Sequence, residues 1–296
     1  MSASSEKVNV FTVSGRMPAA TAQIGSLLIE SGRLTREEAD RVVKLQHERG
    51  LRFGDAAVKL GLVSHSDIEQ VLSRQFDFPY LIPGQSRLSG ELVAAYAPFD
   101  PRVETFRALR SHLMQKWFRL DHRLKHLAVV SPYREEGRTY LAANLAVVFS
   151  QLGERTLLVD ADLRHPRQHV LFGLANKTGL SMLLAARAGL EAIVPITQLP
   201  GLAVLPAGPL PPNPQELLGR PAFDGFLAEI EKAYDVVILD TSPSESSADA
   251  QAVVTRGCGS LVVVRRDRTP VRAVKALADT LLSMGAPLMG AVVNTA

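Results

Sequence analysis

Two short segments of the sequence place acidic side chains directly after apolar runs. The run TLLVD (156–160) ends in Asp160, with Asp162 two residues later, and the run DVVILD (235–240) ends in Asp240. If these runs are parallel strands, their carboxyl ends meet at the edge where open α/β sheets bind ligands. Carboxylates there can hold Mg²⁺ or its waters and orient an attacking hydroxyl group. The pattern therefore predicts a site for cation-assisted chemistry.

A third segment, SPYREEGRTYLAANLAVVF, follows another apolar run, turns and opens a helix. A loop in that position directs backbone N–H groups and the positive end of a helix at an anion. It is similar to a P-loop that ends in Gly-Lys-Ser/Thr, here Gly137-Arg138-Thr139. Arg138 replaces the usual lysine with a planar fork that keeps the charge. Glu135 stands where an earlier glycine is usual, so it adds a carboxylate and lacks glycine's backbone freedom.

Bulk composition limits the class of protein. The chain has 296 residues, enough for one large domain or two modest ones, and its net charge of +3 includes no compact Lys/Arg block, so we expect no nucleic-acid partner. Cys258 is the only cysteine, which excludes an intramolecular disulfide and fits a reducing cytoplasm. No apolar run approaches the roughly 20 residues of a membrane helix. We therefore expect membrane association only through a partner.

The elements that must position these residues alternate between strand-like and helical patterns. Six apolar runs predict strands, at 127–131, 156–160, 202–206, 235–240, 260–265 and 288–294. Nearly continuous apolar strands with helices between them are typical of a parallel sheet covered on both faces. The prediction is an α/β domain with a doubly wound, mostly parallel sheet of the P-loop NTPase-like type.

A small helical tandem-repeat domain is predicted before it. Residues 23–46 align with residues 52–75 at a constant offset, and each copy carries a hydroxyl three residues before an acid, at Thr35 and Ser64. This spacing is a helix-start signal, and two stacked copies can bury apolar faces that one copy cannot. The predicted boundaries are 1–20 for a flexible tail, 21–82 for the repeat domain, 83–103 for a proline-containing linker and 104–296 for the P-loop domain.

Several strings together carry a family resemblance. LLVDADLRHP, the loop GPLPPNP and the Asp-Thr-x-Pro of residues 240–243 are similar to the usual strings of the bacterial tyrosine autokinases of exopolysaccharide biosynthesis. The resemblance runs from about residue 103 to the end. With the repeat domain added, the chain resembles the EpsG-type chain length determinant tyrosine kinases, within the MinD/ParA-like P-loop superfamily.

The resemblance implies ATP and Mg²⁺ as cofactors and tyrosine phosphorylation as the reaction. Asp160 would lie nearest the incoming tyrosine hydroxyl as a catalytic residue, with Asp162 beside it. Mg²⁺ would be held by Thr139, Asp160 and Asp240, the last through water. The residues expected to bind the ATP phosphates are Arg134, Glu136, Gly137, Arg138 and Thr139.

The resemblance also implies partners. In this family the pattern Glu104-x-x-Arg107-x-x-Arg110 lies at a subunit interface, so we expect a homo-oligomer; the same three residues could instead form a solvated charge stripe. The other expected partner is a membrane chain-length regulator (co-polymerase), which would hold this cytoplasmic chain at the inner face of the plasma membrane.

Two alternative functions remain open. A catalytically weak scaffold would keep the fold and the docking role while Glu135 spoils phosphate binding. A nucleotide-switched ATPase of the MinD/ParA type would share the sheet and the paired acids, although Tyr133 occupies the place of its usual signature lysine. The five tyrosines are dispersed rather than clustered at the end. We therefore expect phosphate on a partner or on an internal tyrosine.

The repeat domain has a second resemblance, to the MshE-type N-terminal domains that bind cyclic di-GMP. In that pattern each copy opens with Arg-Leu-Gly, and here the copies open Gln23-Ile24-Gly25 and Arg52-Phe53-Gly54. The resemblance implies a cyclic di-GMP site that includes Gly25, Arg52 and Gly54, with one arginine of the usual pair missing. The alternative is a helical docking module whose glycines serve only turns.

Overall fold

The computed structural model describes residues 20–65, 67–68, 71, 80–120 and 126–295. It divides into two compact units, Met1–Asp77 and Phe78–Ala296. The predicted tail, 1–20, lies outside the described residues except for Ala20, where the first helix begins. Within the described residues, no helix combines the length and the apolar character that crossing a bilayer requires.

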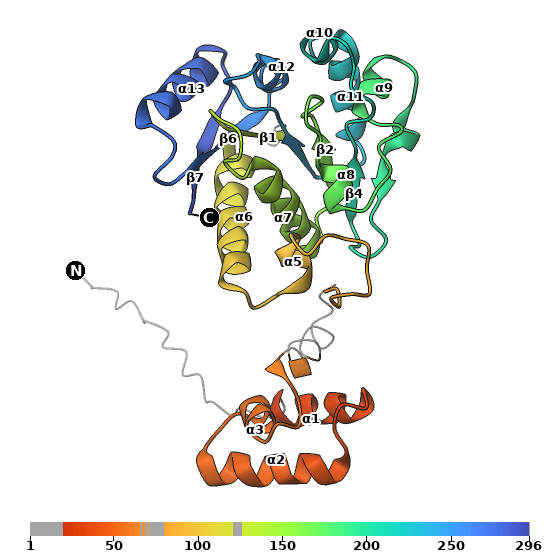
Figure 1. Ribbon diagram of the computed structural model, residues 1–296, viewed down its shortest axis with the longest axis vertical. Helices are drawn as coiled ribbons and strands as arrows, with labels where there is room; N and C mark the ends of the chain where they lie inside the picture. Colours follow the sequence, from red (N-terminus) through yellow and green to blue (C-terminus); the bar gives the residue numbers. More distant parts are fainter. Residues whose placement is uncertain (1–19, 66, 69–70, 72–79, 121–125, 296) are drawn as a thin grey trace, which may run out of the picture. The chain divides into compact units, whose positions relative to one another are not determined.

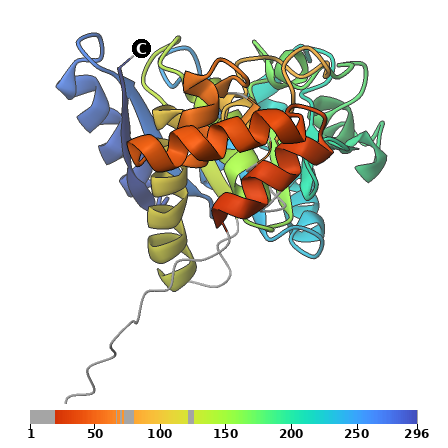
Figure 2. The same ribbon diagram turned by 90° about the horizontal axis from the view of Figure 1, so that it is seen from below.

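The first unit contains α1 (Ala20–Glu30), α2 (Arg36–Arg49) and α3 (Phe53–Lys59), which contact one another (Figures 1 and 2). Both predicted helix starts are confirmed. Thr35 Oγ1 accepts from the backbone N–H of Glu38 at 3.2 Å, and Glu38 accepts from that of Thr35 at 2.8 Å. Ser64 and Asp67 exchange the same pair of bonds. The apolar side chains of both copies form one small core, built from Leu28, Leu34, Ala39, Val42, Phe53, Ala56, Ala57, Val63 and Val71.

The second unit is a layered α/β domain (Figure 1). Its helices are α5 (Val93–Tyr96), α6 (Pro101–Leu120), α7 (Arg138–Gln151), α8 (Gln168–Leu171), α9 (Leu180–Leu184), η1 (Leu190–Ala192), α10 (Pro214–Leu218), α11 (Pro221–Ile230), α12 (Asp249–Val254) and α13 (Val271–Ser283). Its strands are β1 (His126–Val130), β2 (Thr156–Asp160), β3 (Val194–Pro195), β4 (Leu202–Leu205), β5 (Val236–Asp240), β6 (Gly259–Arg265) and β7 (Leu288–Asn294).

The strands form one sheet in the order β3-β4-β2-β5-β1-β6-β7. Every pairing is parallel except that of the short edge strand β3 with β4. The predicted doubly wound sheet is thus confirmed, and the six predicted strands agree with the structure to within one residue at each end. The two-residue strand β3 was not predicted from the sequence. The order places β5 between β2 and β1, so the acidic strand ends adjoin the loop after β1.

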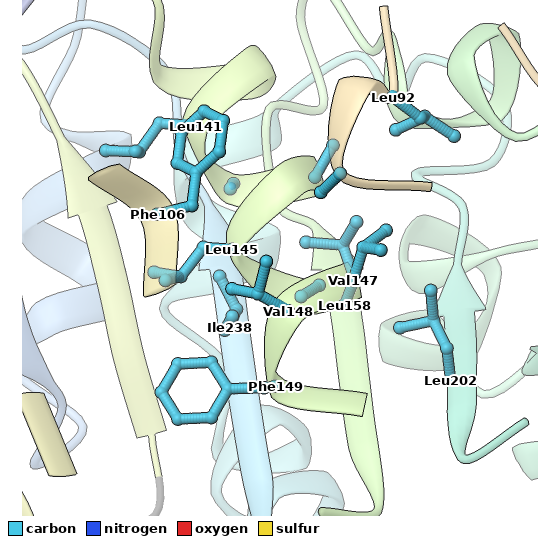
Figure 3. Packing of buried hydrophobic residues seen from close by; sticks show 14 of the residues in the cluster. Leu92, Phe106, Leu141, Leu145, Val147, Val148, Phe149, Leu158, Leu202 and Ile238 are labelled. Carbon is cyan, nitrogen blue, oxygen red and sulfur yellow. The ribbon is translucent and has the colours of Figure 1, made fainter. Parts of the chain in front are cut away.

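The core on one face of the sheet is organised around α7. Twelve of its fourteen residues are buried, which explains why this helix is apolar on nearly every side. Leu145, Val148 and Phe149 of α7 lie close to the strand residues Leu158 and Ile238 (Figure 3). On the other face a second cluster joins the sheet to helices α9 to α13. Burial on both sides fixes the position at which α7 begins, next to the acidic strand ends.

The stretch 83–103, expected as a linker, is instead part of this core. Leu88, Leu92 and Val93 are buried against α7. The backbone of Ala94 donates to Asn144 Oδ1 at 3.0 Å and accepts from Gln151 Nε2 at 2.8 Å. The loop predicted from the prolines is present in only part of this stretch. The apolar residues between the prolines cover the outer side of α7. The boundary between the two units accordingly falls at Asp77, earlier than predicted.

Candidate functional site

The loop after β1 forms a cradle of backbone N–H donors beside a cavity. Gly137, with a φ of 96°, precedes the first residue of α7, Arg138. Among the described residues, no atom accepts a hydrogen bond from the backbone N–H groups of Glu135, Glu136 and Gly137. The first turn of a helix also leaves its N–H groups without intrahelical partners. These donors adjoin a cavity of about 380 Å³ whose walls include Arg134, Glu136, Gly137, Arg138 and Thr139, the residues predicted to bind phosphate.

The two strand-end aspartates lie side by side as predicted. Asp160 of β2 and Asp240 of β5 are directly paired in register, and both are buried. Asp160 Oδ2 accepts from the backbone N–H groups of Arg167 and Gln168 at 3.0 and 2.9 Å. The Oδ1 atoms of both aspartates are buried and have no hydrogen-bond partner within the described part of the chain.

Burial controls the ionisation of this pair. Desolvation raises the pKa of Asp160 well above its ordinary value, and the neighbouring Asp240 raises it further. Desolvation also raises the pKa of Asp240, to about 6, against the opposing effects of the Arg138 charge and of hydrogen bonds from Thr139 and Gln168. Two adjacent buried carboxylates with unpartnered oxygens require either protons or a cation.

These residues fit a magnesium ion that arrives with a nucleotide. Mg²⁺ typically binds one or two carboxylates together with substrate phosphates and waters. The described residues contain no cluster of three His, Cys, Asp or Glu side chains that could hold a metal ion alone. A cation beside Asp160, Asp240 and the Thr139 hydroxyl would therefore depend on oxygens supplied by the ligand.

Asp162 has a different position from Asp160. Its side chain is 7% exposed and lines the cavity, whereas Asp160 is fully buried. Asp162 Oδ1 accepts from the backbone of His165 at 3.0 Å, and its Oδ2 lies 3.8 Å from Arg138 Nη2. Of the two acids predicted to be catalytic, Asp162 thus lines the cavity and Asp160 does not.

Arg138 is turned inward and binds the loop itself. Its Nε donates to the carbonyl of Thr241 at 2.8 Å, and its Nη1 donates to the carbonyl of Tyr133 at 2.9 Å and to the Ser131 hydroxyl. Its Nη2, facing Asp162, remains on the cavity side. The guanidinium therefore connects the two strand-end loops while keeping its charge next to the phosphate cradle.

The side chain of Glu136 also supports the loop. It accepts from the backbone N–H of Tyr133 at 2.9 Å and from the Thr269 hydroxyl. Its carbonyl accepts from Asn294 Nδ2 at 3.1 Å. Any phosphate contact from Glu136 is therefore expected through its backbone N–H group rather than its carboxylate.

Two features of the site were not predicted from the sequence. Gln168 lies buried between Thr139, Asp160 and Asp240, and Asp249 forms a two-bond ion pair with Arg164 that connects the loop after β2 to α12. Gln168 belongs to no pattern of charged or glycine residues, so only the fold reveals it. Arg164 could have been noticed as a basic residue two positions after Asp162, but its partner is distant in sequence.

The residues predicted to form a subunit interface lie on α6. Glu104 is exposed and pairs with Arg107, whose Nη2 donates to the Tyr80 hydroxyl at 2.6 Å. Arg110 Nη1 donates to the carbonyl of Val148 at 2.6 Å and so anchors α6 to α7. Glu104 is thus exposed at the surface, Arg107 is partly buried, and Arg110 has a role inside the domain. Their interface role stays a prediction.

The residues predicted to bind cyclic di-GMP lie in the first unit. Gly25 is inside α1, where an added Cβ would lie 3.2 Å from the Phe53 ring, and Gly54 is inside α3, equally close to Ile68. Arg52 is the exposed residue that precedes α3. Gly25 and Gly54 therefore permit close helix contacts, and the turns are made by Gly32 and Gly61. Cyclic di-GMP binding stays a prediction.

Glu135 adopts the left-handed backbone conformation, with a φ of 60°. That conformation costs a non-glycine residue about 1 kcal/mol. We expect Glu135→Gly to raise the free energy of unfolding by about 0.5 to 1 kcal/mol, part of the gain being lost to the freer unfolded chain. It should also tighten ADP binding, because a carboxylate leaves the phosphate cradle. Denaturant unfolding and calorimetry measure the two effects.

The matched control for this substitution is Ala186→Gly, at an exposed residue with a φ of 57° far from the cradle in sequence. It should bring a similar stabilisation with unchanged ADP affinity. Weaker ADP binding in Glu135→Gly would contradict the expectation that this carboxylate opposes phosphate.

Comparison with known proteins places these features in context. Residues 135–282 match a family model described as an AAA domain. The chain is 35% identical over 209 residues to the tyrosine-protein kinase YwqD of Bacillus subtilis, covering 71% of this chain and 87% of YwqD. It is 34% identical over 193 residues to the putative tyrosine-protein kinase CapB of Staphylococcus aureus, covering 64% of this chain and 83% of CapB.

Solved structures show the same similarity to bacterial tyrosine kinases. The chimerical protein CapA2B2 superposes with a TM-score of 0.65 at 34% identity, over 76% of this chain and 98% of that one. The kinase domain of the Escherichia coli tyrosine kinase ETK gives 0.64 at 33% identity, over 69% and 79%. The septum site-determining protein MinD of Pyrococcus horikoshii, complexed with Mg-ADP, shares the fold at 22% identity, with a TM-score of 0.51 and coverage of 58% and 70%.

Proposed function

The chain belongs to the family of bacterial tyrosine-protein kinases, and we propose that its cavity beside the loop after β1 binds Mg·ATP and transfers the γ-phosphoryl group to a tyrosine hydroxyl. The observation that carries this proposal is the arrangement around the cavity. Free N–H groups and Arg138 lie on one side, Asp162 lies on its wall, and two buried carboxylates with unpartnered oxygens lie next to it.

The proposed reaction forms one bond and breaks one bond. The tyrosine oxygen bonds to the γ-phosphorus, the bond to the β–γ bridging oxygen breaks, and ADP leaves. In this proposal Asp162, which lines the cavity, would accept a hydrogen bond from the hydroxyl and take its proton. Arg138 and the loop N–H groups would stabilise the charge on the transferring group, since positioning and electrostatics carry most of phosphoryl transfer. Mg²⁺, held by Thr139, Asp160 and Asp240, would neutralise phosphate charge.

A second cavity, next to the first, is a candidate site for the nucleoside. It has a volume of about 620 Å³ and shares Gly137 and Tyr140 with the cavity beside the loop after β1. The residues that line it include Phe106, Tyr140 and Asn294. Apolar walls with a few polar groups suit a purine base. We propose that the base lies there, against α6.

We further propose the family's setting for this chain. It would act in exopolysaccharide biosynthesis with a membrane chain-length regulator, remain cytoplasmic, reach the inner face of the plasma membrane through that partner, and assemble with copies of itself through Glu104, Arg107 and Arg110. The strings that resemble the EpsG-type kinases support this setting. Tyr140 lies between the two proposed nucleotide cavities, so a phosphate acceptor is expected elsewhere, on the partner or on another tyrosine.

The test is incubation of the full chain with Mg·ATP and the membrane partner, followed by mass spectrometry of both proteins. We expect phosphotyrosine with the unchanged chain and at least a hundredfold less with Asp162→Asn. Phosphate release without phosphotyrosine would favour the MinD/ParA-type ATPase. No binding at millimolar ATP would favour the scaffold.

For the first unit we retain the proposal of a cyclic di-GMP site at Gly25, Arg52 and Gly54 beside the alternative of a docking module. The exposed arginine at the start of α3 supports the first, and the packing role of the two glycines supports the second. Titration of the full chain with cyclic di-GMP, with Arg52→Ala in parallel, separates them. Affinity that is weaker than about 100 μM, or unaffected by the substitution, would leave the docking module.

A further inference from the structure

Gln168 forms hydrogen bonds with all three residues expected to hold the cation: with the carboxylates of Asp160 and Asp240 and with the backbone carbonyl of Thr139. It is the first residue of α8 and is completely buried. Its backbone N–H donates to Asp160 Oδ2 at 2.9 Å. Its side-chain Nε2 donates to Asp240 Oδ2 at 2.9 Å and to the carbonyl of Thr139 at 3.1 Å. The residue thus connects α7, β2 and β5 at the point where the three elements meet.

The remaining acceptors at this point are incomplete. Gln168 Oε1, Asp160 Oδ1 and Asp240 Oδ1 are all buried, and none has a hydrogen-bond partner within the described residues. A buried acceptor without a donor costs about 1–3 kcal/mol. A glutamine that served only the packing of α8 would be expected to have its own acceptor satisfied. Three unsatisfied oxygens on three bonded residues indicate a group that is to be bound.

The chemistry of the side chain suits that purpose. A neutral amide can hold a carboxylate by hydrogen bonding without neutralising it. A lysine or arginine in the same place would cancel a charge of the aspartate pair and compete with a cation. The Gln168 amide occupies Oδ2 of Asp240, and the backbone N–H of the same residue occupies Oδ2 of Asp160, so the Oδ1 atom of each aspartate stays free for the ion.

We propose that Gln168 is the positioning residue of the cation site. It orients Asp160 and Asp240 through their Oδ2 atoms and holds the start of α7 through Thr139. Its Oε1 is available to accept a hydrogen bond from a water that accompanies the cation. This inference rests on the proposed function, because it assumes that the two aspartates bind Mg²⁺ with the nucleotide. Outer-shell partners of this kind typically contribute 10- to 100-fold to metal affinity.

The test compares ADP binding with and without Mg²⁺ by calorimetry. Gln168→Met keeps the length of the side chain and removes both polar atoms. We expect it to leave Mg²⁺-free ADP affinity within about twofold of the original, because the loop N–H groups are untouched. The gain in ADP affinity that Mg²⁺ provides should fall 10- to 100-fold. Val170→Ala, at an exposed residue of the same helix, is the matched control and should change neither value.

A second variant provides a readout that does not depend on ADP binding. Gln168→Glu keeps the shape but replaces the donor with a third carboxylate, so the metal-free melting temperature should fall and Mg²⁺ alone should raise it more than in the original protein. A purely structural role would lower ADP affinity equally with and without Mg²⁺. An unchanged Mg²⁺ effect in both variants overturns the inference while leaving the proposed function intact. No Mg²⁺ effect in the unchanged chain overturns both.

Discussion

Asp240→Asn is expected to abolish Mg²⁺-dependent nucleotide binding while making the nucleotide-free protein more stable. Asparagine keeps the shape of the side chain and an oxygen that can accept from Gln168 Nε2. It removes one of two adjacent buried carboxylates whose Oδ1 atoms have no hydrogen-bond partner among the described residues. In the protein without nucleotide, the substitution therefore relieves the repulsion and the desolvation of the carboxylate pair, and it removes the charge that the metal requires. We expect Mg²⁺-dependent ADP affinity to fall at least a hundredfold.

The stability gain should depend on pH in a defined direction. The pKa of Asp240 is raised from 3.8 to about 6 in the folded protein. The folded state therefore binds the proton more tightly than the unfolded state, and this contribution to stability is fully present below about pH 4. It is lost as pH rises through 6, to a total of about 3 kcal/mol at most. Asp240→Asn should thus stabilise the protein by up to that amount at pH 8 and by little at pH 4.

Denaturant unfolding at the two pH values measures this difference. Asp249→Asn is the matched control, since Asp249 is equally buried but is paired with Arg164 through two hydrogen bonds. Replacing the Asp249 carboxylate by an amide should destabilise the protein by about 1–3 kcal/mol, because the partly exposed Arg164 keeps its charge and loses its charged partner. A loss of stability at pH 8 in Asp240→Asn, together with retained Mg²⁺ dependence, would show that Asp240 serves the fold rather than a cation.

Asp240→Asn and Asp249→Asn are expected to change the free energy of unfolding in opposite directions. The comparison illustrates which features of buried aspartates could be predicted from the sequence. Asp160 and Asp240 were found because strong strand patterns end at both, and the order of a doubly wound sheet brings such ends together. Their pairing in register follows directly from that topology. Asp249 lies after a loop of serines, and nothing local indicates a partner 85 residues away.

Prediction from local sequence signals also failed for the stretch 83–103 and for Gln168. The capping residues Thr35 and Ser64 were predicted because a hydroxyl and an acid three residues apart have a short-range function. The packing of Leu88 and Leu92 on α7 depends on a helix that begins 46 residues after Leu92. Gln168 is recognisable only by the three groups it contacts, which come from separate elements. Residues that act through distant neighbours are visible only after folding.

Substitution of Arg138 is expected to have the second large effect on stability and ADP affinity. The sequence predicts that Arg138 binds phosphate, whereas the structure shows that it also holds the loop. Three of its donors hold the loop, while its Nη2 lies on the cavity side near Asp162. Arg138→Met should lower the free energy of unfolding by about 2–4 kcal/mol, since buried carbonyls lose donors and Asp162 loses its charged neighbour. It should also weaken ADP binding at least a hundredfold, because the phosphates lose their nearest buried positive charge.

Arg138→Lys separates the two tasks. A lysine keeps the charge as a compact ammonium but cannot reproduce the planar fork that reaches Thr241, Tyr133 and Ser131 together. We expect a loss of about 1–2 kcal/mol in stability, with ADP affinity within about threefold of the original or tighter. Arg155→Lys, at an exposed arginine bound to Asp235 by two bonds, is the control and should cost below about 1 kcal/mol. Unfolding curves and calorimetry on the same samples decide the question. If Arg138→Lys kept full stability and lost ADP binding, the guanidinium fork would be a phosphate ligand, and its inward hydrogen bonds would carry no weight in the fold.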